Sequence, residues 1–182
     1  MCIRDRSEMM IERFKYENLK TDLIQRIKGK YPGLYSIQTD KKGNRSFSYW
    51  RNESAAKEMI KKCNIDNLEK FIGNTELFYY TGISLGILKP KDQNKLIELS
   101  KKSKLTAFDF NYRNSFHGNK IKSQSLFKKS NFFSKINFIS FDDIIEIFGK
   151  SDPFQFINTF KRKDNIIILK HFEKIFYSEF NK

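Results

Sequence analysis

The most informative chemical pattern in the sequence is an aspartate, an asparagine and an arginine at alternating positions. Asp109, Asn111 and Arg113 stand at the end of the largely apolar run 105–110 and just beyond it. Alternate residues of an extended chain point to the same side, so these side chains can face one cleft. The guanidinium of Arg113 can donate two parallel hydrogen bonds, which suits a carboxylate or a phosphate. Taken alone, the residues also fit a structural ion pair beside a turn asparagine.

A second arginine lies among tyrosines in a predicted β-hairpin. The runs 34–39 and 46–51 are rich in aromatic and β-forming residues, and a turn with glycine and asparagine separates them. Tyr35 lies on one face of the first strand, and Tyr49 and Arg51 share a face of the second. Such a hairpin could cover a cleft as a lid, or it could be an edge hairpin with an exposed arginine.

Other catalytic motifs are absent from the sequence. His117 and His171 are isolated and lack metal-ligand spacing, and Cys63 lies in a helical pattern that fits a small core residue. The sequence contains no P-loop lysine motif, no other glycine-rich phosphate loop and no dinucleotide fingerprint. We therefore expect no protein-held metal site.

The elements that must position these side chains alternate along the chain. Strands are expected at 76–81, 105–110, 136–141 and 165–169, and helices at 7–19, 52–63, 66–72, 90–102, within 113–135, 142–148 and 153–160, with a turn at 82–86. This order favours a parallel sheet with helices on both faces. In such sheets ligands bind beyond the carboxyl ends of the strands. That rule selects the Asp109 pattern, the residues after Thr81, and Ser140 with the acidic pair Asp142 and Asp143.

The composition limits the classes of protein. The 182 residues carry 35 Lys and Arg against 21 Asp and Glu, a net charge of +14, with 19 Phe and 8 Tyr for a core. The length fits one domain or part of one. The basic residues are scattered, and the abundance of lysine and isoleucine fits an AT-rich coding bias, so no specific nucleic-acid partner is expected.

No apolar run approaches the ~18 residues of a membrane helix. No signal peptide is recognised either, so a cytoplasmic setting without a membrane partner is expected.

Five sequence blocks in order resemble one known family. They are the stretches 31–40, 43–56, 80–88, 109–113 and 140–149. Together they resemble the 2-dehydro-3-deoxygluconate kinases, which belong to the PfkB, ribokinase-like carbohydrate kinases. The resemblance implies an α/β fold, a three-layer α/β/α arrangement with a mostly parallel sheet and a small β lid, incomplete at both ends. It places the lid hairpin at about 33–52 of a partial PfkB domain at 7–182.

The resemblance also implies an activity and a set of site residues. It implies ATP-dependent phosphorylation of 2-dehydro-3-deoxy-D-gluconate at O6, with Mg²⁺, the sugar acid and ATP being the partners. The positions that match the family's substrate contacts are Tyr35, Tyr49, Arg51, Asn111 and Arg113. Those that match its nucleotide side are Ser140, Asp143 and Lys170. The carboxylate of a sugar acid suits an arginine fork.

The sequence departs from the family pattern in several places. The family's substrate-binding glycine pair and its Gly-Ala-Gly-Asp-like loop have no counterpart, and the aspartate of that loop is the catalytic base. No catalytic residue is therefore expected in this chain. Residues 1–6 match nothing in the family and are expected to be a non-native leader. Phe172 and Ile175 stand where the family has glycines near the nucleotide.

These departures predict an internal fragment of a sugar-acid kinase, inactive by itself although its parent is an enzyme. Two alternatives stay open. One is another PfkB-type kinase for a neutral sugar, such as a fructokinase. The other is a basic nucleic-acid-binding module. Pairing of two chains through the lid is a further expectation from the family.

Overall fold

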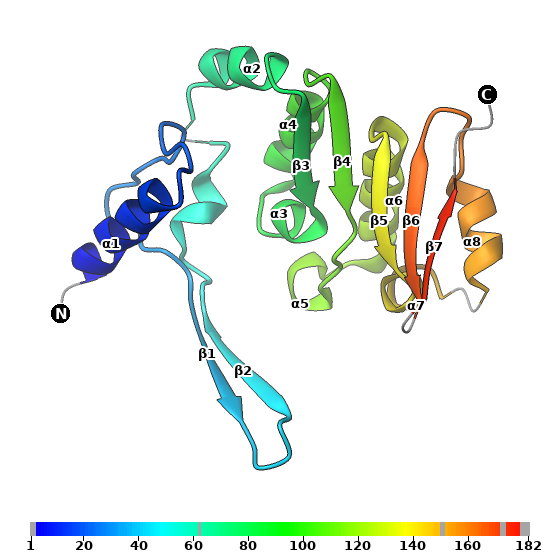
Figure 1. Cartoon of the computed structure of the whole chain (residues 1–182), viewed down its shortest axis with the longest axis horizontal. Helices are drawn as coiled ribbons and strands as arrows, with labels where there is room; N and C mark the ends of the chain where they lie inside the picture. The colour runs from blue at the N-terminus through cyan, green and yellow to red at the C-terminus, as the bar shows by residue number, and fades with distance from the viewer. Residues whose placement is uncertain (1–2, 62, 150–151, 172–173, 179–182) are drawn as a thin grey trace. The chain divides into compact units, whose positions relative to one another are not determined.

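The computed structural model describes residues 3–61, 63–149, 152–171 and 174–178. The chain divides into two compact units, unit 1 at Met1–Cys63 and unit 2 at Asn64–Lys182 (Figure 1). Within the described residues, none of the helices is both long enough and apolar enough to cross a membrane.

Unit 1 begins with helix α1 (Ile3–Tyr16). The helix starts earlier than the expected 7–19 and ends earlier, so residues 3–6 of the expected leader are helical, and residues 1–2 lie outside the described part. The early end has a local cause, because Asn18 takes a left-handed backbone with φ of 58°. The amide of Leu19 then donates to the carbonyl of Phe14 at 2.9 Å, as in a Schellman cap.

The predicted hairpin is confirmed. Strands β1 (Leu34–Thr39) and β2 (Arg45–Trp50) pair antiparallel. The carboxylate of Asp40 accepts the amide hydrogens of Lys42 and Asn44 at 2.8 and 2.9 Å, which closes the turn between the strands. The hairpin projects from the rest of unit 1 (Figure 1).

The helix expected at 52–63 is wrong over most of its length. Among the described residues of that stretch, only the 3-10 helix η1 (Ala55–Glu58) forms. Ser54 is extended and makes an isolated parallel bridge with Tyr31, and the amide of Ala55 donates to the carbonyl of Tyr31 at 2.9 Å. A long-range contact therefore keeps the chain extended where local preference favours a helix.

Unit 2 is built on a five-stranded sheet in the order β3-β4-β5-β6-β7. Its strands are β3 (Leu77–Thr81), β4 (Leu105–Asp109), β5 (Ile136–Ser140), β6 (Ile166–His171) and β7 (Lys174–Ser178). The first four are parallel, which confirms the mostly parallel α/β class. β7 runs antiparallel to β6 and was not predicted from the sequence. Ile175 lies in β7, whereas Phe172 lies outside the described residues.

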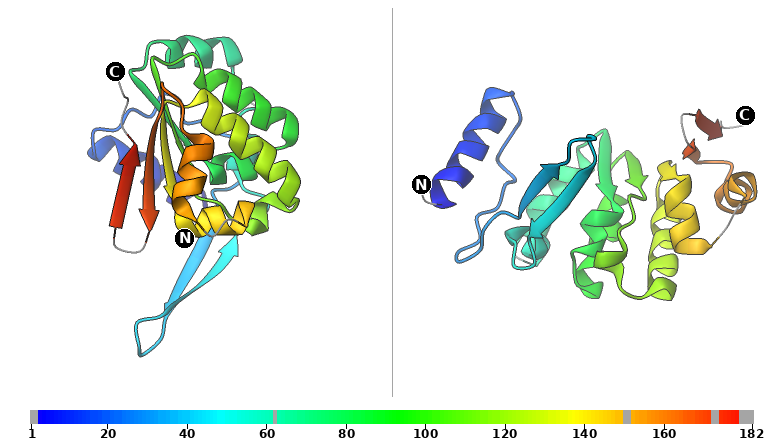
Figure 2. Two further views of the ribbon diagram at one scale, coloured as in Figure 1. Left: turned by 90° about the vertical axis from the view of Figure 1, so that its right-hand side faces the viewer. Right: turned by 90° about the horizontal axis from the view of Figure 1, so that it is seen from below.

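The helices of unit 2 lie on one face of the sheet (Figure 2). They are α2 (Ile65–Gly73), α3 (Gly82–Gly86), α4 (Pro90–Ser100), α5 (Asn114–His117), α6 (Lys120–Phe133), α7 (Phe141–Phe148) and α8 (Pro153–Phe160). Two local expectations are corrected. The stretch 82–86 is a one-turn helix, because the hydroxyl of Thr81 accepts the amide hydrogen of Ser84. The stretch 113–135 holds two helices, with Gly118 at φ of 57° between them.

The core lies between this face and the helices and is rich in aromatic rings. Phe108, Phe110 and Phe127 are fully buried, with ring centroids 5.2–5.5 Å apart. Phe156 and Phe160 of α8 extend the cluster. The ring cluster therefore joins β4 and the chain that follows it to α6 and α8.

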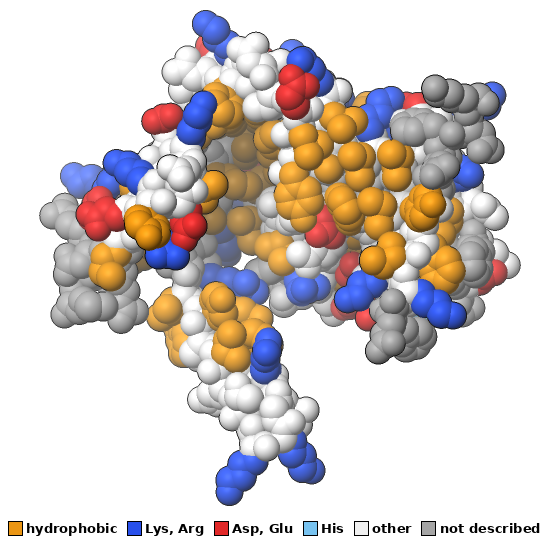
Figure 3. Space-filling view, viewed as in Figure 1, with side chains coloured by type: hydrophobic (Ala, Val, Ile, Leu, Met, Phe, Trp, Pro, Cys, Tyr) orange, Lys and Arg blue, Asp and Glu red, His pale blue; other side chains and the backbone are white. Residues whose placement is uncertain are grey.

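The other face of the sheet carries exposed apolar side chains. Leu77, Tyr79, Phe138, Ile175 and Tyr177 are all exposed there, and they occupy alternating strand positions in register. Figure 3 shows apolar side chains gathered over this face. Of the three layers expected, the described residues of unit 2 supply the sheet and one helix layer.

Candidate functional site

A cavity of about 690 Å³ opens at the carboxyl ends of the parallel strands in unit 2. All five unit 2 residues predicted from the sequence line it: Asn111, Arg113, Ser140, Asp143 and Lys170. Strand register explains part of this, because Asp109 pairs with Phe138 and Ser140 pairs with Lys170 across neighbouring strands. The position agrees with the rule that ligands bind beyond the carboxyl ends of parallel strands.

The loop after β4 carries the arginine. The amide of Phe110 donates to the carbonyl of Phe138 at 2.9 Å, which continues the sheet by one step. Asn111 then takes a positive φ of 33°, a conformation that asparagine tolerates better than most residues. Asp109, Asn111 and Arg113 still line one cavity, but this turn rather than simple strand alternation brings the last two there.

Helix α7 contributes the second group of residues. The hydroxyl of Ser140 caps the helix by accepting the amide hydrogen of Asp143 at 3.1 Å. The Oδ1 atom of Asp143 accepts the amide hydrogen of Tyr112 at 3.0 Å. Burial raises the pKa of the Asp143 carboxyl, while the Ser140 hydroxyl, the Tyr112 amide and the charge of Arg113 act in the opposite direction.

Asp109 is held from the neighbouring strand. The hydroxyl of Tyr79 donates to Oδ2 of Asp109 at 2.8 Å. Burial of the hydroxyl and this hydrogen bond raise the pKa of Tyr79 to about 12. The carboxylate is therefore fixed at the cavity rim by a side chain from β3.

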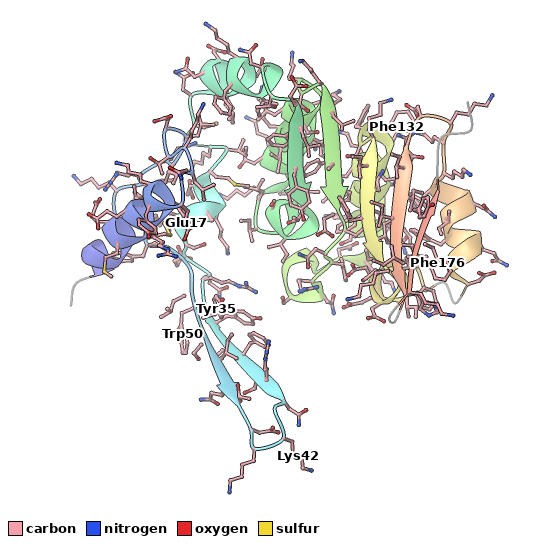
Figure 4. The ribbon with its side chains drawn as sticks, in the orientation of Figure 1. Glu17, Tyr35, Lys42, Trp50, Phe132 and Phe176 are labelled. Carbon is pink, nitrogen blue, oxygen red and sulfur yellow. The ribbon has the colours of Figure 1, made fainter. Side chains whose placement is uncertain are left out.

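The three residues predicted for the lid lie on the hairpin of unit 1. Tyr35 and Tyr49 pair directly across the strands, with ring centroids 6.3 Å apart. The guanidinium carbon of Arg51 lies 3.9 Å from the Tyr49 ring centroid, a cation–π contact. Figure 4 shows Tyr35 and Trp50 pointing to opposite sides of the hairpin, as the register requires. The face of the hairpin that carries Tyr35 and Tyr49 thus presents two tyrosine hydroxyls and the guanidinium of Arg51.

The predicted residues therefore form two groups, one in each unit. Sequence reasoning missed several lining residues, among them Glu146 and Ile168. Glu146 stands three residues after Asp143 on a helix, and that spacing was a usable signal. Ile175, which stands where the family has a glycine near the nucleotide, also lines the cavity, although its strand β7 was not predicted.

The side chains that line the cavity indicate which kind of cofactor could bind there. Arg113 and Lys170 offer cationic donors for an anionic ligand such as a nucleotide phosphate. In the described part of the chain, no group of three or more His, Cys, Asp or Glu residues could hold a metal ion. Arg113 and Lys170 thus fit a phosphate-bearing or carboxylate-bearing ligand.

Comparison with known proteins identifies the family. A model described as pfkB family carbohydrate kinase matches residues 4–159, well over half of the chain. The chain belongs to the pfkB family of carbohydrate kinases. The cavity at 109–113 and most of its lining lie within the matched residues of this PfkB chain.

Named relatives and solved structures agree with this assignment. The 2-dehydro-3-deoxygluconokinase of Escherichia coli (strain K12) is 34% identical over 148 residues, which cover 79% of this chain and 48% of that protein. The PfkB chain thus spans about half the length of the curated relatives it matches.

Two crystal structures share the fold at low sequence identity. The PfkB protein from Polaromonas sp. JS666 has a TM-score of 0.76 at 13% identity, covering 93% of this chain and 58% of that one. The fructokinase with bound ATP from Xylella fastidiosa has a TM-score of 0.74 at 14% identity, covering 94% and 53%. These likenesses support the ribokinase-like fold.

Proposed function

We propose that this PfkB chain is the acceptor-binding part of an ATP-dependent kinase that phosphorylates 2-dehydro-3-deoxy-D-gluconate at O6. The observation that carries the proposal is the placement of Arg113 at the cavity beyond the parallel strands. The name of a relative with 34% identity supports the choice of substrate.

The substrate carboxylate is what separates this proposal from a neutral-sugar kinase. An arginine fork binds a carboxylate through two charge-assisted hydrogen bonds, and a neutral sugar offers no such partner. We assign this role to Arg113, with Asn111 beside it. Arg51, Tyr35 and Tyr49 form the second set of contacts, with the hairpin acting as a lid.

The nucleotide side of the proposal rests on three residues. Lys170 is exposed at the cavity, and Ser140 and Asp143 lie at the first turn of α7. Lys170 would attract the nucleotide phosphates, and the helix N-terminus adds a favourable dipole. Mg²⁺ would arrive with these phosphates, which supply some of its oxygen ligands in such sites, while waters and carboxylates supply the others. We assign no residue of this chain as a ligand of Mg²⁺. We also propose that the reaction takes place in the cytoplasm.

A calorimetric or NMR titration of the 182-residue chain tests the acceptor. We expect binding of 2-dehydro-3-deoxy-D-gluconate and no comparable binding of fructose. Arg113→Gln is expected to weaken binding of the acid about tenfold or more, since it removes charge-assisted hydrogen bonds. Lys122→Gln on α6 removes the same charge away from the cavity and should change little. Equal binding of acid and fructose would instead favour a neutral-sugar kinase.

The lid is tested in the same way. Arg51→Gln is expected to weaken binding of the acid, whereas Arg45→Gln, on the same strand, serves as the control of equal charge. Equal effects of the two variants would contradict a specific role for Arg51. We also propose that two copies of the chain pair through the hairpin. Sedimentation of the chain with and without a charge introduced at Tyr35 tests this pairing.

Phosphoryl transfer is proposed to need more than these residues. The 182-residue sequence contains no Gly-Ala-Gly-Asp-like loop, and such a loop supplies a base and amide donors at the reacting atoms. With ATP, Mg²⁺ and the sugar acid, a coupled assay should therefore detect no ADP release above background. Robust turnover would show that residues of this chain supply the missing groups.

A further inference from the structure

The loop that carries Arg113 is tied at two successive points. One tie is the backbone hydrogen bond from Phe110 to Phe138, which extends the sheet. The other is the hydrogen bond from the Tyr112 amide to the carboxylate of Asp143. Asn111 with its positive φ lies between the two ties, so the turn that directs Arg113 is held on both sides.

The second tie spans a long separation in sequence and uses a buried charge. Asp143 is only 7% exposed, although its side chain belongs to a type that is seldom buried without a partner. Its own amide is taken up by the Ser140 cap, which fixes the start of α7 and hence the place of the carboxylate. A buried carboxylate that accepts a backbone amide hydrogen forms a stronger bond than a neutral acceptor.

Asp143 therefore has a second role besides lining the proposed nucleotide-binding side of the cavity. We propose that Asp143 is a positioning residue that holds the Asn111–Arg113 turn in its acceptor-binding conformation through the Tyr112 amide. The Ser140 cap and the carboxylate thereby connect the start of α7 to the loop that carries Arg113. The part of this inference that concerns the acceptor rests on the proposed function; the part that concerns the loop does not.

The neighbouring Asp142 provides a matched control. It lies in the same first turn of α7, carries the same charge and lines the same cavity. Among the described residues, its carboxylate makes no hydrogen bond to the 110–113 loop. Helix-dipole and overall charge effects should therefore be alike for substitutions at the two positions.

Hydrogen exchange at the Tyr112 amide tests the loop directly. In the wild-type chain this amide should exchange clearly more slowly than that of Asn111. Asp143→Ala should speed its exchange about 10- to 100-fold, the range expected for loss of a hydrogen bond to a charged group. Asp143→Asn keeps an acceptor oxygen and should restore most of the protection, and Asp142→Ala should leave it unchanged. Fast exchange in the wild type would overturn the proposal even if Asp143→Ala fails to fold.

Titration with 2-dehydro-3-deoxy-D-gluconate, followed by NMR, tests the consequence for binding. We expect Asp143→Ala to weaken binding about tenfold, with rescue by Asp143→Asn. Lost protection at Tyr112 with wild-type affinity would overturn the positioning role. If the wild-type chain binds no sugar acid, the proposed function fails, while the exchange measurement still decides whether Asp143 holds the loop.

Discussion

Substitution of Gly82 is the sharpest test of how packing holds the loop that carries Arg113. Gly82 is the first residue of α3, and a Cβ atom built on it would lie 2.0 Å from the carbonyl oxygen of Phe110. The same atom would lie 2.6 Å from Cζ of Phe127, a fully buried ring. Gly82→Ala therefore cannot be accommodated unless the backbone at Phe110 or the ring moves.

The expected cost follows from these contacts. Overpacking a tight core costs roughly 1–3 kcal/mol, and a clash with backbone places this site at the upper end. The better helix propensity of alanine returns at most about 1 kcal/mol. We expect Gly82→Ala to lower the free energy of unfolding of unit 2 by about 2 kcal/mol. Because Phe110 precedes Asn111, the variant should also weaken acceptor binding.

Urea unfolding followed by far-UV circular dichroism measures this effect. The single tryptophan, Trp50, lies in the unit 1 hairpin, so its fluorescence does not report on unit 2 directly. Gly73→Ala is the control, since that helical glycine has only the Lys102 carbonyl oxygen near its Cβ position, at 3.9 Å. It should be neutral or stabilising by up to about 1 kcal/mol. Similar shifts for the two variants would refute the packing argument.

Three further outcomes test other parts of the molecule. Hydrogen bonds from the Asn44 side chain and nearby amides lower the pKa of Asp40 from 3.8, so its stabilisation of the turn is present above that pH and lost as pH falls through the lowered pKa. Asp40→Ala should alter tryptophan fluorescence at neutral pH and have little effect in strong acid. Burial of the Tyr79 hydroxyl and its hydrogen bond raise its pKa to about 12, so its stabilising effect is complete below pH 10.0 and lost as pH rises through about 12. Tyr79→Phe should remove that part of the alkaline loss of stability, and tyrosinate absorbance should show one fewer late-titrating group. Ile175→Lys with Tyr177→Lys, both 68% exposed, should reduce binding of an apolar dye and shift stability by less than about 0.5 kcal/mol each.

The exposed sheet face explains why the last test is informative. Parallel sheets are normally covered on both faces, and this face carries apolar side chains at successive in-register positions. A dye that binds exposed apolar surface should therefore respond to charges placed on β7. No change in dye binding would mean that the apolar face is covered in solution.

The sequence alone was sufficient for the four parallel strands and for many, but not all, of the residues that line the cavity. Strand and helix periodicity are local properties, and parallel order then brings the ends of β4, β5 and β6 to one edge. The sequence thus predicts that Asn111, Arg113 and Ser140 lie at the same edge of the sheet. The hairpin was equally predictable, because its turn residues and alternation act within a few positions.

Other features were decided only by contacts between distant parts of the chain. Ser54 is extended because of Tyr31, and Asp143 reaches the Tyr112 amide from another element. Strand β7 depends on an available edge of β6, and the need for glycine at position 82 depends on Phe110 and Phe127. Local sequence specifies which elements can form, whereas packing and hydrogen bonds between distant residues determine where each ends and how the turn before Arg113 is held.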